Sequence, residues 1–210
     1  MAGSASVLED SSLLSRLDRG LLPFERALAL CSGLAAFSLM FFAVWSVGGR
    51  KFFASPMLGY VDYIEALMPV IAILGVSYVQ REGGHIRMDI VVGLLKGRAL
   101  WLFELITVTA ILILMLALVW GAWAHFDRSF DMGRPYWSRD SSIDVGMPLW
   151  PSKLVVPIAF AVLCLRAALQ IAGYARAFIY NIPRPAGVPL VLSAAEQAMA
   201  EAEQLEKANK

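Results

Sequence analysis

The sequence is poor in charged residues. They make up 17% of its 210 residues, against about 25% in average soluble domains, whereas hydrophobic residues make up 59%. The mean hydropathy is +0.64. Because so few polar groups cannot cover the apolar surface in water, the composition predicts an integral membrane protein. The net charge of +1 gives no reason to expect nucleic-acid binding.

Cysteine and histidine are also scarce. Cys31 and Cys164 stand inside apolar runs, so we interpret them as small buried hydrophobes and predict neither a disulfide framework nor a metal site. Haem held between membrane helices needs axial ligands at membrane depth, usually histidine. His85 and His125 lie outside or at the end of the apolar runs, so a membrane cytochrome is disfavoured. We expect no cofactor and no catalytic site.

Four apolar segments are long enough to cross a bilayer, which takes about 20 helical residues. They cover about 24–47, 60–79, 99–124 and 150–178 and predict an all-α membrane protein with four transmembrane helices. The transmembrane domain, 23–180, lies between a 1–22 tail and a 181–210 tail. Residues 13–22 predict a short interfacial amphipathic helix, with Asp18 on its polar face, that ends at Pro23. Pro69 is expected to kink the second span.

Lysine and arginine are unevenly distributed around the spans. If the N-terminus lies inside, the inner ends of the spans carry more of these residues than the outer ends. The positive-inside rule therefore places both tails and the connection between spans two and three in the cytoplasm. The 125–148 connection then lies outside, and a loop of that length is expected to have a function or a partner.

Two acidic residues open the second span. Asp62 and Glu65 are three residues apart and therefore share a helix face. One interpretation is a pair of carboxylates that binds a cation. The other is that both side chains are solvated at the interface or contact a partner helix. In the first span, Gly33 and its small neighbours predict close approach of a partner helix.

Three polar residues fall deeper in the spans. In antiparallel helices, Glu104 and Arg166 both reach the inner part of the bilayer, and Gln170 lies one turn from Arg166. Intramembrane charges are usually paired or face a protein interior. We therefore predict that Glu104 pairs with Arg166, with Gln170 as a further partner. The alternative is that Arg166 extends to the interface alone and Glu104 contacts another subunit.

A polar segment joins the second and third spans. The residues that carry its pattern are Arg81, Gly83, Gly84, His85, Ile86, Arg87 and Asp89. The paired glycines predict the end of the second span, because glycine adopts backbone angles that other residues avoid. The apolar spacing that follows is typical of a helix lying in the interface, although an ordinary loop also fits. We interpret His85 as a hydrogen-bonding loop residue rather than a ligand.

The same segment resembles a family signature. The run Arg81-x-Gly-Gly-His-Ile-Arg-Met-Asp89 is similar to the motif that ends the second span of the small membrane subunit (the Q-type small permease) of tripartite ATP-independent periplasmic (TRAP) transporters. Asp62 and then Leu74-Gly75 follow that family's order, and the stretch 148–153 resembles the start of its fourth span. A basic residue that often follows the acidic opening is absent. The long 125–148 loop resembles the mannitol and chloroaromatic-compound branch.

The resemblance, which covers about residues 20–180, implies partners. In this family a large membrane subunit of about twelve spans carries the sodium and substrate sites, and a periplasmic binding protein delivers the substrate, commonly an organic acid. The small subunit packs against the large one in the bacterial inner membrane. The implied function is therefore a scaffold subunit of a sodium-coupled transporter, not an enzyme. Candidates for the partner interface are Gly33, Asp62, Glu65 and Gly75.

Two other classes of protein stay open at this point. One is the membrane anchor of a respiratory enzyme, which would bind quinone or haem. The other is a small stand-alone channel or exporter. Its spans would be expected to line a polar path, whereas the first and third spans are apolar nearly throughout.

Overall fold

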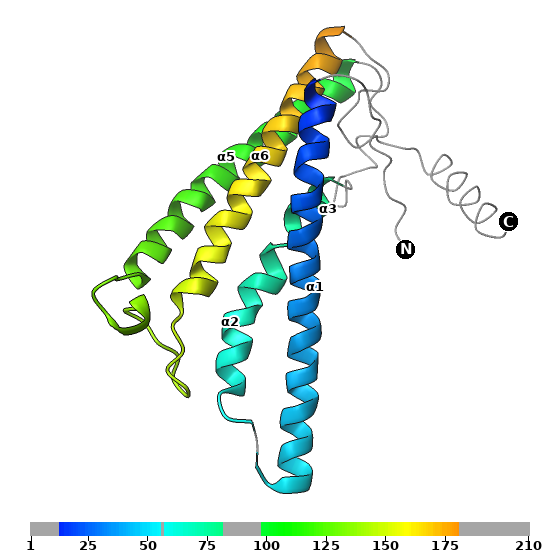
Figure 1. Cartoon of the computed structure of the whole chain (residues 1–210). Helices are drawn as coiled ribbons and strands as arrows, with labels where there is room; N and C mark the ends of the chain where they lie inside the picture. The colour runs from blue at the N-terminus through cyan, green and yellow to red at the C-terminus, as the bar shows by residue number, and fades with distance from the viewer. Residues whose placement is uncertain (1–12, 56, 82–97, 181–210) are drawn as a thin grey trace, which may run out of the picture. The chain divides into compact units, whose positions relative to one another are not determined.

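The computed structural model describes residues 13–55, 57–81 and 98–180 (Figure 1). Within these ranges four helical stretches are long and apolar enough to cross a membrane, and the only β-pairing is two isolated bridges. The predicted all-α membrane fold with four spans is therefore confirmed. Predictions for the 1–12 and 181–210 tails, and for Gly83, Gly84, His85, Ile86, Arg87 and Asp89, lie outside the described residues.

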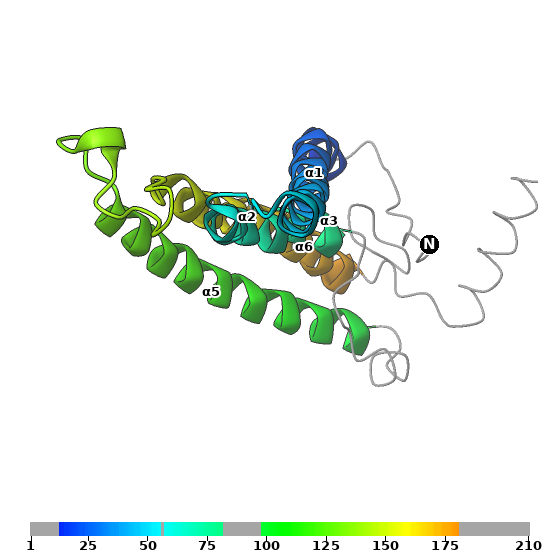
Figure 2. The ribbon, with the colours of Figure 1, turned by 90° about the horizontal axis from the view of Figure 1, so that it is seen from below.

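Helices account for most of the described chain. They are α1 (Leu13–Phe53), α2 (Tyr60–Ile73), α3 (Val76–Arg81), α5 (Arg98–Ser129), the short 3-10 helix η1 (Pro135–Trp137) and α6 (Trp150–Tyr180). Together α2 and α3 form the second span. Figure 2 shows that α5 runs without a break along its whole length.

The predicted break at Pro23 is wrong. α1 continues through this proline, so the expected interfacial helix is instead the first turns of the first span. Proline removes one backbone donor and crowds the preceding turn. On either side of it, however, Asp18 and Glu25 are buried and bonded to side chains of α3. These contacts favour a helical backbone across the proline.

The second span is interrupted at Leu74 and Gly75, whereas Pro69 lies inside α2. In an unbroken helix the carbonyl of Ile71 accepts a hydrogen bond from the amide of Gly75. Here the Ser32 hydroxyl of α1 donates to that carbonyl at 2.9 Å. Backbone acceptors in a bilayer must be satisfied within the protein, so Ser32 stabilises the point at which the helix is interrupted.

The chain forms two compact units. The first contains the described parts of Met1–Leu21, Val79–Leu112 and Arg166–Lys210. Its apolar core lies between α5 and α6, where the ring centroids of Trp101 and Tyr174 are 6.1 Å apart. Val108 of α5 and the alanines Ala167 and Ala177 of α6 complete this core. Small residues at such a contact let two membrane helices approach closely.

The second unit contains Leu22–Tyr78 and Ile113–Leu165. In it α1 packs antiparallel to α2 and α3 (Figure 1). Three contacts define this pairing: Ser77 with Glu25, Ser32 with Ile71, and the ring of Phe42 against that of Tyr63. As the residue number rises along α1 it falls along the second span, which is the antiparallel arrangement expected of consecutive spans.

We predict that Ser32→Ala destabilises the protein by about 1 kcal/mol, because it leaves the Ile71 carbonyl without the donor from α1. The matched control is Ser38→Ala, whose hydroxyl bonds only the Leu34 carbonyl of its own helix in an exposed position. Unfolding of both variants in detergent by added SDS gives the comparison. Equal effects at the two positions would contradict this role for Ser32.

Candidate functional site

Buried polar side chains from three helices meet in the first unit. The Asp18 carboxylate of α1 accepts a hydrogen bond from Arg81 of α3, with Nη2 and Oδ2 2.7 Å apart, and a second from Nη1 of Arg166 in α6. The exposed fractions are 3% for Asp18, 5% for Arg81 and 0% for Arg166. One carboxylate therefore ties α1, α3 and α6 together. We call these three residues the Asp18 cluster.

A pair of amides extends the cluster by about one helical turn. Gln80 Nε2 donates to Gln170 Oε1 at 2.9 Å, and Gln170 Nε2 donates to the backbone carbonyl of Gln80 at 3.4 Å. Both side chains are buried. Side-chain hydrogen bonds between membrane helices contribute about 0.6 kcal/mol on average, so this contact adds orientation more than it adds stability.

The partners predicted for Arg166 differ from those observed. Arg166 bonds Asp18 in place of Glu104, and Gln170 bonds Gln80 in place of Arg166. Glu104 is itself buried in α5. The sequence pattern does not predict this partner, because Asp18 falls in the segment before Pro23 that is expected to form an interfacial helix. Once α1 continues through that proline, Asp18 becomes part of the first span.

A second polar contact joins the second span to the long loop. Asp62, at the start of α2, is buried. Its Oδ2 accepts hydrogen bonds from the Ser142 hydroxyl and the Val145 amide, each at 2.7 Å, and its Oδ1 accepts the Asp144 amide at 3.4 Å. The Asp62 carboxylate therefore accepts hydrogen bonds from donors within the protein, whereas Glu65 is exposed. The two acids do not share one environment, and Asp62 acts as an anchor for the loop.

The loop packs closely against the start of α2 at Gly59. This residue has a φ of 72°, a conformation that favours glycine. A Cβ atom here would lie 2.1 Å from Cγ2 of Val145. Any larger residue at position 59 would therefore push the loop away from its anchor at Asp62.

Ion pairs fix the rest of the 130–148 loop. The Lys153 ammonium at the start of α6 lies 2.6 Å from Asp140 Oδ2, which also accepts the Ser129 hydroxyl. The Lys153 hydrogen bond, followed by that of Ser129, holds the pKa of Asp140 below its ordinary value. The Gly133 amide, followed by the Arg139 guanidinium, lowers the pKa of Asp131 in the same way.

Aromatic packing connects this loop to the two helices that it joins. The ring of Phe130 meets that of Trp150 edge-on, with centroids 5.5 Å apart. The Trp150 indole also donates to the backbone carbonyl of Tyr136 at 3.0 Å. The loop that the sequence marked only as long and polar is therefore a folded structure, and its shape is set by the ends of α5 and α6.

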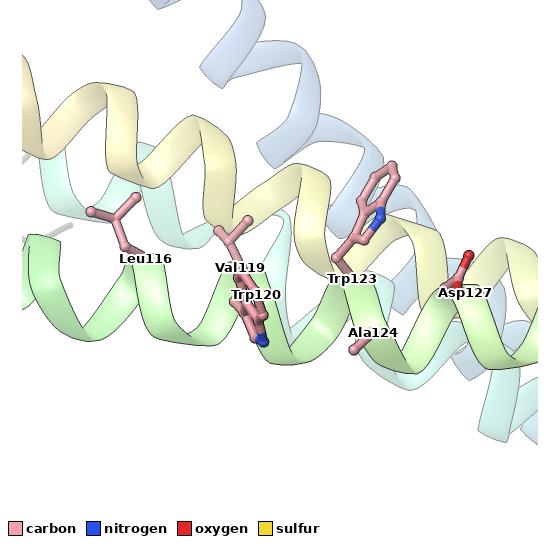
Figure 3. Close-up of a pocket in the computed structure, with 6 residues that line it drawn as sticks. All are labelled: Leu116, Val119, Trp120, Trp123, Ala124 and Asp127. Atoms are coloured by element: carbon pink, nitrogen blue, oxygen red, sulfur yellow. The ribbon is translucent and has the colours of Figure 1, made fainter.

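Two apolar surfaces of the second unit are exposed. On α1, a stripe of large residues repeats at alternate spacings of four and three: Leu30, Leu34, Phe37, Phe41 and Val44. On α5, the residues that line one pocket all come from this helix and are labelled in Figure 3: Leu116, Val119, Trp120, Trp123, Ala124 and Asp127. Exposed apolar surfaces on helices able to span a membrane are expected to face lipid or another protein.

The glycines predicted at a partner interface differ in their surroundings. A Cβ added at Gly33 would meet nothing within 4 Å, so this glycine lies on an open face beside the α1 stripe. A Cβ added at Gly75 would lie 3.9 Å from the Ser32 hydroxyl oxygen. Gly75 therefore lies against α1, whereas Gly33 has open space around it, and the partner interface predicted at these glycines stays a prediction.

These features define a class: a polytopic membrane protein whose polar side chains hold its helices and outer loop together. The sequence pattern of the family described as "Tripartite ATP-independent periplasmic transporters, DctQ component" matches residues 39–177, and the chain belongs to that family. No curated protein matches the chain. The resemblance to the small TRAP subunit is thus confirmed, and the assignment to the mannitol and chloroaromatic-compound branch stays a prediction.

We predict that Asp18→Asn lowers the free energy of unfolding by about 3–5 kcal/mol, because it removes the carboxylate that two buried guanidinium groups share. Asp127→Asn is the control, since that carboxylate is exposed on α5. Thermal or SDS-induced unfolding in detergent measures both. In a double-mutant cycle, Arg166→Gln should couple to Asp18→Asn and not to Glu104→Gln; the reverse pattern would restore the Glu104 pairing.

We predict that Asp140 titrates below the ordinary aspartate pKa of about 3.9. Its contact with Lys153 therefore stabilises the loop above that pH, and this stabilisation is lost as the pH falls through the lower pKa of the folded state. Carboxyl NMR of the labelled protein in detergent gives the midpoint. Lys153→Met should raise the midpoint of Asp140 and leave that of Asp131 in place; an unmoved Asp140 would contradict this assignment.

Proposed function

We propose that the chain is a scaffold subunit of a sodium-coupled TRAP transporter. In this proposal the complex takes up an organic acid or a similar small solute that a periplasmic binding protein delivers. The large membrane subunit then supplies the sodium and substrate ligands. The observation that supports the proposal is that the carboxylates of Asp18 and Asp62 both accept hydrogen bonds from donors within the chain.

The exposed stripe on α1 supports a partner helix in the membrane. Its alternate spacings of four and three residues follow the 3.5-residue period that brings two helices into knobs-into-holes contact. Gly33 flanks the stripe with open space around it. Since lipid tails are as apolar as leucine, close packing at such small residues drives helix association in a bilayer. We assign this face to the large subunit.

The proposed orientation places the tails inside and the loop outside. The bias of lysine and arginine toward the tail side supports it. The chain then lies in the bacterial inner membrane with its folded 130–148 loop in the periplasm. Asp62, which anchors that loop, is at the outer end of the second span in this orientation.

Uptake into proteoliposomes tests the proposal. Vesicles that contain the large subunit and the binding protein should take up substrate only when this chain is also present. In a scaffold role, removal of the chain abolishes uptake because the large subunit loses its fixed support. Full sodium-driven uptake without the chain would overturn the proposal.

We predict that Gly33→Leu weakens assembly with the large subunit at least about tenfold, which corresponds to 1.4 kcal/mol. The physical reason is that the added side chain fills the open space beside the α1 stripe. Gly121→Leu is the matched control, because Gly121 is equally open but lies on α5. Co-purification and uptake should fall together for Gly33→Leu only. An equal loss for Gly121→Leu would argue against docking on α1.

A further inference from the structure

A second pocket, apart from both polar contacts described above, opens between helices of the second unit. It has a volume of about 270 Å³ and is lined by residues of α2, α5 and α6 and by Leu149, which directly precedes α6. This is room for several waters or for a small polar headgroup. Its polar lining is Glu65, His125, Ser152 and Lys153.

Glu65 is the unusual member of this pocket. It lies within the second span, and its side chain is exposed. Within the described ranges it makes no hydrogen bond or ion pair, in contrast to Asp62 one turn before it. A carboxylate in a membrane span is costly unless it is paired or faces a polar cavity. The pocket therefore offers an anionic group that is ready to accept a cationic donor.

The only ammonium in the pocket lining is largely committed elsewhere. Lys153 Nζ donates to Asp140 at 2.6 Å and to Ser129 at 3.2 Å. An ammonium has three donors, so one remains for a ligand. Together, Glu65 in the pocket and Asp140 beside Lys153 supply two carboxylates for the one ammonium of Lys153. A ligand for this site therefore needs a positive end for Glu65 and an acceptor oxygen for Lys153.

The remaining walls are apolar. Pro69 of α2, Ala122 of α5 and Val156 of α6 line the pocket beside the charged groups. All three come from segments that are able to span the membrane. A ligand that places a polar zwitterion beside hydrocarbon matches this lining better than a fully polar solute does.

We propose that this pocket binds a primary-ammonium phosphate zwitterion, supplied as the headgroup of an aminophospholipid such as phosphatidylethanolamine. The ammonium donates to Glu65, and a phosphate oxygen accepts the remaining N–H of Lys153. The acyl chains lie along the apolar wall. This assignment concerns the isolated chain and does not depend on the proposed transport role.

Native mass spectrometry of the full chain in detergent tests the assignment. Phosphatidylethanolamine, its N-methylated forms, phosphatidylcholine and phosphatidylglycerol are titrated separately. Phosphatidylethanolamine should bind roughly tenfold more tightly than phosphatidylcholine or phosphatidylglycerol, as expected for a charge-assisted hydrogen bond. Affinity should fall as methyl groups replace the ammonium hydrogens. A flat series on the unchanged protein would overturn the proposal without any variant.

A pair of matched variants locates the site. Glu65→Gln should remove the preference for phosphatidylethanolamine, and Asp127→Asn, which removes an exposed carboxylate outside this pocket, should leave it intact. Persistence of the preference in Glu65→Gln, or its loss in both variants, would overturn the assignment.

Competition with soluble phosphoethanolamine distinguishes the two possible sources of the zwitterion, a lipid headgroup and a free solute. Failure to displace the lipid supports a lipid site, whereas full displacement at equal concentration overturns the lipid as the ligand.

Discussion

The fold of the first unit depends on one carboxylate. Asp18 stands between two guanidinium groups, Arg81 and Arg166, and all three residues are buried. Alone, any of these charges would be too costly within a membrane domain. Their mutual contact makes the positions of α1, α3 and α6 interdependent, because no helix can move without separating a buried charge from its partner. Such a cluster specifies one arrangement of helices more than it adds net stability.

The need to pair buried polar groups also explains how the elements of the second unit are held together. Ser32 donates to the Ile71 carbonyl where the second span is interrupted, and Asp62 accepts the amides and hydroxyl that shape the outer loop. In each case a polar group of one element is satisfied by a neighbouring element, as a low-dielectric environment demands. The Glu65 carboxylate has no such partner in the described part of the chain, and in our proposal a ligand supplies one.

The sequence was sufficient to predict the four spans but not the side-chain contacts between them. Uninterrupted apolar runs locate the four spans because membrane thickness fixes their length. The partner of Arg166 was missed because proline usually ends a helix, whereas buried contacts at Asp18 and Glu25 maintain α1 across Pro23. The fold of the loop could not be predicted either, because it depends on contacts of Gly59 and Asp62 with residues that are distant in sequence. Contacts between residues that are distant in sequence leave no local periodic pattern from which they could be predicted.

We propose that polar residues of the spans organise this chain and leave ion binding to its partner. Asp62→Asn is a direct test, because Asp62 opens the second span and is one of the two acids whose spacing also allows a cation site. The measurement is the sodium concentration for half-maximal uptake by the reconstituted complex carrying Asp62→Asn. The account predicts an unchanged sodium dependence, with any loss confined to the amount of assembled complex. A several-fold shift in that concentration would show that this subunit binds the coupling ion and would contradict the account.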